Sequence, residues 1–270
     1  MLSFKQELVG VFGQPVAENP TQAMIEAAFR HHDLDWRYLT IEVAPADLHA
    51  AVEGARAMRF RGFNCTIPHK VAVLDHLDSI GESARQIGAV NTVVRRGDEL
   101  VGENTDGKGF IESLRTVTDP AGKRVVILGA GGAARAIAVE LVLAGAAHLT
   151  VVNRRRRDLP VEADLQLWEG DYAVPTGTDV LVNATPIGLY PDVDARLPVD
   201  VDTLPAIVAD VIPNPPETRL LRNASARAST TLDGLGMLVG QGRIAFELWT
   251  GVLPDEGVMR EALERAFRGG

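Results

Sequence analysis

Residues 123–158 read KRVVILGAGGAARAIAVELVLAGAAHLTVVNRRRRD, and this stretch decides the fold. Val125 to Leu128 are consecutive apolar residues, mostly β-branched, which is typical of a strand buried on both faces. A glycine-rich turn follows, and then an apolar helix that we expect to end before Gly145, a good C-terminal capping residue. Because His148 to Val152 predict another strand, the stretch indicates one strand–turn–helix–strand unit of a parallel sheet.

The glycine-rich turn fits the pattern G-x-G-x-x-A, in which each small residue has a physical role. Gly129 permits a tight turn, Gly131 lets the backbone approach a pyrophosphate, and Ala134 lets the helix pack closely on the sheet. A turn that only permits close packing is the alternative, but it does not explain the basic residues after the second strand. We therefore predict a dinucleotide site at this turn, with the candidate residues Gly129, Ala130, Gly131, Gly132 and Ala133.

The residues after the second strand predict which dinucleotide is bound. An NAD site usually has Asp or Glu there, on the ribose hydroxyls, whereas this chain has Asn153 followed by four arginines, 154–157. Guanidinium groups pair with phosphate, and an acidic residue would repel a 2′-phosphate. NADP is therefore preferred over NAD, with Asn153, Arg154 and Arg155 as candidate contacts; a solvated basic loop is the alternative.

Composition limits the class of protein. The length of 270 residues suggests about two domains. The net charge of -9 argues against nucleic-acid binding. The single cysteine, Cys65, permits no internal disulfide and fits a reducing compartment. No stretch resembles a signal peptide or a membrane span. We expect a soluble, cytoplasmic protein with a small-molecule substrate and no membrane partner.

The rest of the chain extends the α/β pattern. The first hundred residues alternate predicted strands and helices. Residues 180–183 and 207–211 read as further buried strands, and 230–232 as a short one, so the sheet around the glycine-rich turn is doubly wound. We predict an N-terminal α/β substrate domain (1–103 plus 237–270), a Rossmann-type nucleotide-binding domain (104–236), and a cleft between them.

Two polar segments could carry the proton chemistry of a hydride transfer. One is NCTIPHK, residues 64–70, at the end of a predicted strand, and the other is NTDG, residues 104–107, at the junction of the domains. Lys70 could exchange a proton with a carbonyl oxygen, while Asp106 holds and tunes the lysine. Taken singly, either residue could be a surface charge or a helix cap. The amides Asn64 and Asn91 would fix substrate hydroxyls.

Seven motifs resemble, in the same order, those of the shikimate dehydrogenase family: GFNCTIPHK, GAVNTVV, ENTDGKGF, GAGGAARA, NRRRR, NATPIGL and GLGMLVGQGRIAFELWTG. The resemblance implies NADPH-linked interconversion of 3-dehydroshikimate and shikimate, or a close relative, in the chorismate pathway. It assigns the catalytic pair to Lys70 and Asp106 and no metal. It implies substrate contacts at Asn19, Thr21, Asn64, Thr66, Asn91 and Gln241. It adds Thr185 and Met237 to the cofactor contacts, with Met237 beside the nicotinamide.

Two motifs depart from the family pattern. The family usually has Ser-x-Ser on the substrate carboxylate, where this chain has Asn19 and Thr21, with Glu18 just before them. The family usually has tyrosine where this chain has Pro213. Asn19 could instead cap the helix that follows it. We expect poorer turnover of shikimate than in a Ser-x-Ser enzyme.

The sequence is also compatible with other functions. Quinate or aminoshikimate could be the true substrate. A catalytically weak NADPH-binding regulator is a second class, although it would have no use for the retained lysine, aspartate and amides. An unrelated Rossmann reductase, such as a folate-linked dehydrogenase, does not account for the full set of motifs. The protein is expected to be a monomer or a homodimer.

Overall fold

The computed structural model describes residues 5–268, which divide into two compact units. The first unit runs up to Thr105 and includes the chain from Gly242 onward, and the second is Asp106–Gln241. The predicted domain boundaries, after residues 103 and 236, lie close to these divisions. No helix within residues 5–268 is long and apolar enough to cross a membrane.

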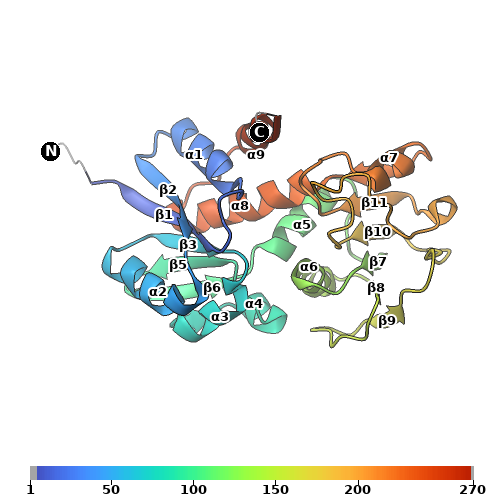
Figure 1. Ribbon diagram of the computed structural model, residues 1–270, viewed down its shortest axis with the longest axis horizontal. Coiled ribbons are helices and arrows are strands. Elements are labelled where there is room, and N and C mark those ends of the chain that lie inside the picture. Colours follow the sequence, from blue (N-terminus) through green and yellow to red (C-terminus); the bar gives the residue numbers. More distant parts are fainter. Residues whose placement is uncertain (1–4, 269–270) are drawn as a thin grey trace. The chain divides into compact units, whose positions relative to one another are not determined.

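The first unit is built on a mixed six-stranded sheet with the order β2-β1-β3-β5-β6-β4. Figure 1 labels β1, β2, β3, β5 and β6 of this sheet. Its strands are β1 (Glu7–Gly13), β2 (Trp36–Glu42), β3 (Gly62–Cys65), β4 (Ser79–Ile80), β5 (Thr92–Arg96) and β6 (Glu99–Glu103). Its helices are α1 (Thr21–His31), α2 (Leu48–Ala57), α3 (His69–Ala72), α4 (Glu82–Ile87) and α9 (Glu256–Arg268), with short 3-10 turns at Pro45–Asp47 and Val73–His76.

Strand register in this sheet gathers residues that are distant in the sequence. Strand β3 is antiparallel to β5, with Asn64 opposite Thr92, and β5 is antiparallel to β6, with Thr92 opposite Glu103. The chain after β3, the chain before β5 and the chain after β6 therefore meet at one end of three adjacent strands. This end carries both polar segments that the sequence singles out.

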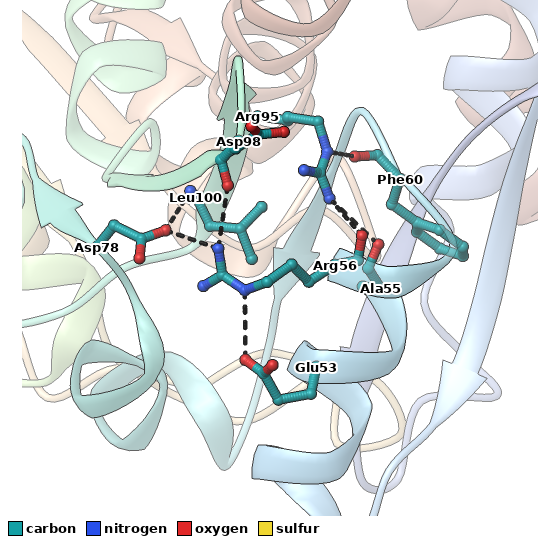
Figure 2. A network of polar contacts seen from close by, with 8 residues as sticks. All are labelled: Glu53, Ala55, Arg56, Phe60, Asp78, Arg95, Asp98 and Leu100. Atoms are coloured by element: carbon teal, nitrogen blue, oxygen red, sulfur yellow. Dashed lines mark hydrogen bonds and ion pairs between the residues drawn. The ribbon is translucent and has the colours of Figure 1, made fainter.

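Two arginines tie helix α2 to the rest of the first unit (Figure 2). The Arg95 guanidinium donates to the carbonyl of Arg56 (2.9 Å), in the last turn of the helix, and to that of Phe60 (2.7 Å), three residues after the helix ends. Arg56 donates in turn to Asp78 (2.8 Å), which also accepts from the Leu100 N–H (2.6 Å). These bonds hold the pKa of Asp78 below its usual value, and the bond from Leu100 has the largest effect.

The second unit has a fully parallel six-stranded sheet with the order β12-β11-β10-β7-β8-β9, which is the doubly wound arrangement that the sequence predicts. Its strands are β7 (Arg124–Leu128), β8 (His148–Asn153), β9 (Asp164–Leu167), β10 (Val180–Asn183), β11 (Ile207–Asp210) and β12 (Thr230–Leu232). Its helices are α5 (Asp106–Arg115), α6 (Gly132–Leu143) and α7 (Arg219–Ser225), with a 3-10 turn at Val201–Thr203, and α8 (Gly234–Thr250) continues into the first unit.

Apolar cores cover both faces of this parallel sheet. Val125 and Ile127 of β7 pack in a core with α5 and α6, while the alternate residues Val126 and Leu128 pack in a core with α7. Both faces of β7 are therefore buried, which explains its continuous apolar sequence. Ala134 lies in the first of these cores, so its small side chain lets α6 approach the sheet, as predicted.

Candidate active site

A cavity of about 480 Å³ lies in the second unit, at the carboxyl ends of its parallel strands. Residues that line it include Gly129, Ala130 and Gly131 after β7, Asn153 and Arg154 at the end of β8, and Thr185 after β10. Ligands of open parallel sheets bind at this edge, next to the strand where the order reverses. The cavity therefore has the position of a nucleotide site.

The glycine-rich turn forms a cradle with room for phosphate. Gly129 has a φ of 101°, in the left-handed region that favours glycine, and a Cβ there would lie 3.0 Å from the Ala184 carbonyl oxygen. A Cβ on Gly131 or Gly132 would meet nothing within 4 Å, so the space in front of the turn is open. Helix α6 begins here, and its first N–H groups favour an anion. The turn fits the diphosphate of a dinucleotide.

The four arginines do not contribute equally to the cavity. All four are exposed, but Arg154 lines the cavity and Arg155 lies outside the lining. The Arg155 carbonyl accepts from the Asn153 side chain (2.8 Å). Trp168, which the sequence does not predict as a site residue, also lines the cavity, and its backbone N–H donates to the Asn153 carbonyl (3.0 Å). Arg154 is therefore the arginine best placed for a ribose phosphate.

Three further predicted cofactor residues, besides Arg155, lie outside the lining of this cavity. Gly132 and Ala133 form the start of α6, directly after the turn. Met237 is only 9% exposed and packs in the core with α5 and α6. The role of Met237 in nicotinamide binding stays a prediction.

In the first unit, amide and hydroxyl side chains form a continuous network at the end of β3, β5 and β6. We call Tyr38, Asn64, Asn91, Thr92 and Thr105 the polar cluster. The Asn64 amide donates to the Asn91 carbonyl (3.1 Å) and to the Thr92 hydroxyl (3.0 Å), and the Asn91 amide donates to the Thr105 hydroxyl (3.0 Å). The structure thus brings together Asn64 and Asn91, which the sequence predicts as substrate contacts.

Tyr38 is the member of the polar cluster that the sequence does not predict. It is fully buried, and its hydroxyl donates to the Asn64 side-chain oxygen at 2.7 Å. Burial raises the pKa of Tyr38 well above its usual value, so the phenol stays neutral. Since Asn64 uses both of its N–H groups within the cluster, it retains only acceptor capacity for a ligand.

Lys70 and the junction residue Thr105 are both tied to the segment Val90–Asn91. The backbone carbonyl of Lys70 accepts from the Val90 N–H at 2.7 Å. The Asn91 side-chain oxygen accepts from the Thr105 N–H at 2.8 Å. Asp106 is the next residue along the chain. The segment Val90–Asn91 therefore holds the backbone of Lys70 and that of Thr105, the residue directly before Asp106.

At the predicted carboxylate subsite, the Asn19 side chain is bonded to the backbone. The Asn19 side-chain oxygen accepts from the Thr21 N–H at 3.0 Å, a local turn at the start of α1. Asn19 therefore has a structural role at the helix start, and its oxygen is turned to the backbone. Thr21 is buried, and Pro213, in place of the family's tyrosine, is half-buried.

The other predicted residues have ordinary surroundings. Thr66 is half-buried directly after β3, and Gln241 is buried in α8, where its amide donates to the Leu238 carbonyl (3.0 Å). Burial raises the pKa of the Cys65 thiol to about 12, which makes it a poor nucleophile. Within residues 5–268, no group of three or more His, Cys, Asp or Glu is placed to hold a metal ion.

The fold and the cavity define a Rossmann-type α/β protein with a dinucleotide site. Residues 11–93 match the model of the shikimate dehydrogenase substrate binding domain, and residues 234–264 match that of the shikimate 5'-dehydrogenase C-terminal domain. The shikimate dehydrogenase (NADP(+)) of Desulforamulus reducens is 41% identical over 97% of this chain and 96% of its own, and that of Symbiobacterium thermophilum is 43% identical over 97% and 95%. The chain belongs to the shikimate dehydrogenase family of NADP-dependent oxidoreductases.

Solved structures add a relative with a different substrate. The ligand-free 5-ketofructose reductase of Gluconobacter sp. strain CHM43 is 56% identical, with a TM-score of 0.94 over 98% of this chain and 100% of that one. A shikimate dehydrogenase in complex with NADP+ is 36% identical, with a TM-score of 0.90 over 99% and 98%. Membership of the family therefore leaves the substrate to be decided at the site.

Proposed function

We propose that this chain reversibly reduces the carbonyl group of a small polyhydroxylated ketone, with NADPH as the hydride source. The NADP(+)-dependent relatives support the cofactor, as does the cavity with its open glycine cradle and Arg154. When bound, NADPH supplies a hydride to the carbonyl carbon. The observation that carries the proposal is the polar cluster, which holds amides and hydroxyls next to the segment that binds the Lys70 backbone.

Lys70 carries the proton in this proposal. In the direction of reduction, its ammonium group donates a proton to the carbonyl oxygen, and in the direction of oxidation its amine accepts the proton of the alcohol. Asp106 is assigned as the carboxylate that binds the lysine, because it directly follows Thr105, whose backbone N–H is bonded to Asn91. Asn64 is assigned to accept a hydrogen bond from a substrate hydroxyl, since its donors are used within the polar cluster.

The first candidate substrate pair is 3-dehydroshikimate and shikimate, or a close relative such as quinate. Relatives with about 40% identity over nearly the whole chain carry the name of this activity. The lysine, aspartate and amides of the family motifs are present in this chain. We assign the protein to the cytoplasm, because a single cysteine in 270 residues fits a reducing compartment.

A neutral keto-sugar is the second candidate, and a specific observation favours it. Asn19 replaces a family serine, and its oxygen is bound to the backbone of its own helix. A keto-sugar has several hydroxyls and no carboxylate, so it suits an acceptor such as Asn64 and does not need the Ser-x-Ser pair. The 5-ketofructose reductase, at 56% identity, is more similar than any of the three shikimate dehydrogenases described above. We therefore propose that the keto-sugar is the better substrate.

Replacement of Lys70 tests the catalytic assignment. Lys70→Ala should lower kcat by on the order of 100-fold or more, because general acid–base catalysis typically contributes that much. The matched control is Lys123→Ala, which removes a lysine directly before β7, at the opposite end of the strand from the cavity. Near-normal turnover by Lys70→Ala would refute the assignment. NADPH binding without turnover of any polyhydroxylated ketone would favour a regulator instead.

A further inference from the structure

A buried carboxylate that the proposed reaction does not use lies at the cavity end of the second sheet. Asp210, the last residue of β11, is 2% exposed. One of its carboxylate oxygens accepts from the Thr218 hydroxyl (2.8 Å), and the other accepts from the Asn183 amide (3.0 Å) and the Ile212 N–H (3.1 Å). All three partners are uncharged donors. An ionised carboxylate can only accept hydrogen bonds, so each group around it must turn a donor toward it.

Asn183 links Asp210 to the loop that follows β10, because its side chain bonds to both. It is fully buried at the end of β10 and lies opposite Asp210 in the strand register. A side-chain amide has its donors on one side and its acceptor on the other. Because the amide nitrogen of Asn183 donates to Asp210, its oxygen faces Thr185. It accepts there from the Thr185 N–H (3.0 Å) and from the Thr185 hydroxyl (2.7 Å).

Thr185 is where this chain of bonds reaches the cavity. Its hydroxyl proton is directed to Asn183, and its oxygen accepts from the Ile187 N–H at 3.2 Å. Thr185 and Ile187 both line the cavity. A Cβ on Gly129 would lie 3.1 Å from the Thr185 methyl carbon, so the loop also packs on the nucleotide turn. The loop that forms one wall of the cavity is therefore held by bonds that end at Asp210.

We propose that Asp210 is a positioning residue for the dinucleotide: through Asn183 it fixes the loop 184–187 and leaves the Thr185 oxygen as an acceptor toward the cavity. The matching group on the ligand is a hydrogen-bond donor, such as a ribose hydroxyl, and not a phosphate oxygen. The inference rests on the proposed use of this cavity by NADPH. It adds a role for a residue that lies outside the cavity lining.

The test is a titration of NADPH fluorescence with the purified protein, together with thermal unfolding. Asp210→Ala should raise the Kd for NADPH by about 10-fold, which corresponds to the loss of about one hydrogen bond in the site. Asp210→Asn keeps an oxygen for the Asn183 amide, and should recover most of the affinity. The control is Asp179→Ala, which removes a carboxylate that accepts from the Arg124 N–H (2.8 Å) before β10 and should lower Tm without changing the Kd.

A second variant keeps the proposal falsifiable if Asp210→Ala does not fold. Thr185→Val keeps the shape of the side chain and removes its hydroxyl, and should raise the Kd for NADPH. Thr178→Val is its control, because that hydroxyl donates to the Pro175 carbonyl (2.8 Å), away from the cavity lining. A lower Tm with an unchanged Kd in Asp210→Ala, or wild-type affinity in Thr185→Val, would overturn the inference. Since binding needs no turnover, normal binding without catalysis would count against the proposed reaction alone.

Discussion

The nucleotide cavity of the second unit and the polar cluster of the first are built by different means. The cavity depends on backbone and space: glycines that leave room, the start of a helix, and Arg154. The polar cluster depends on buried side chains that bond to one another, such as Tyr38 with Asn64 and Asn91 with Thr105. A local motif can therefore specify the cofactor, whereas the substrate is specified by side chains brought together from distant segments.

The two regions should also differ in how their contribution to stability depends on pH. Burial raises the pKa of Asp210 to about 6 from an ordinary value of 3.8. Its protonated form therefore contributes stability that is fully present below pH 3.8 and is lost as the pH rises through about 6. The contribution is about 3 kcal/mol, from a shift of roughly two units. The polar cluster is made of neutral groups and should add no such dependence.

Urea unfolding of the wild type and of Asp210→Asn at pH 4 and pH 7 measures this contribution. The variant cannot titrate at this position, so the difference between the two proteins should change by up to about 3 kcal/mol between the two pH values. A constant difference would show that the carboxylate titrates normally in the folded state.

Arg154 gives the sharpest test of the cofactor side. Arg154→Ala should raise KM for NADPH by about 10-fold or more, since a hydrogen bond to a charged group contributes roughly 1.5–3 kcal/mol. KM for NADH should change little, because NADH has no 2′-phosphate. Arg157→Ala is the matched control, as Arg157 is exposed and outside the cavity lining. Equal effects on both cofactors would exclude recognition of that phosphate by Arg154.

Tyr38 gives a smaller test of the substrate side. Tyr38→Phe removes the hydroxyl that donates to Asn64 and should lower stability by about 1 kcal/mol. It should also raise KM for the ketone several-fold, because Asn64 loses an orienting partner, and leave the Kd for NADPH unchanged. Tyr172→Phe, which removes a bond to Gln166 (2.9 Å) in the second unit, is the control. Unchanged KM in Tyr38→Phe would separate the polar cluster from substrate binding.

The sequence predicts the second unit better than the first. The doubly wound parallel sheet and the tight turn at Gly129 are both predicted from the sequence, and the structure confirms the parallel sheet and gives Gly129 a left-handed φ. Strand β9 and helix α7 were not predicted, because β9 is only four residues long with no buried residue and α7 only seven residues long. Short elements gain their stability from neighbours in the fold and have weak local patterns.

The sites show the same limit. Nothing near Tyr38 indicates that it meets Asn64, which is 26 residues away and on a strand that does not neighbour its own. The four arginines look equivalent in the sequence, yet of these Arg154 lines the cavity. The residue types in a site can be predicted from motifs, but their partners depend on long-range packing.

The most direct measurement of the central claim is kcat/KM with NADPH for 5-ketofructose and for 3-dehydroshikimate on the same preparation. The account predicts that the wild type favours the neutral keto-sugar by at least about 10-fold, as expected when a charged group lacks its hydrogen-bond donors. Combined Asn19→Ser, Thr21→Ser and Pro213→Tyr substitutions should shift the ratio toward 3-dehydroshikimate. The account would be contradicted if the wild type prefers 3-dehydroshikimate and these substitutions leave the ratio of the two kcat/KM values unchanged.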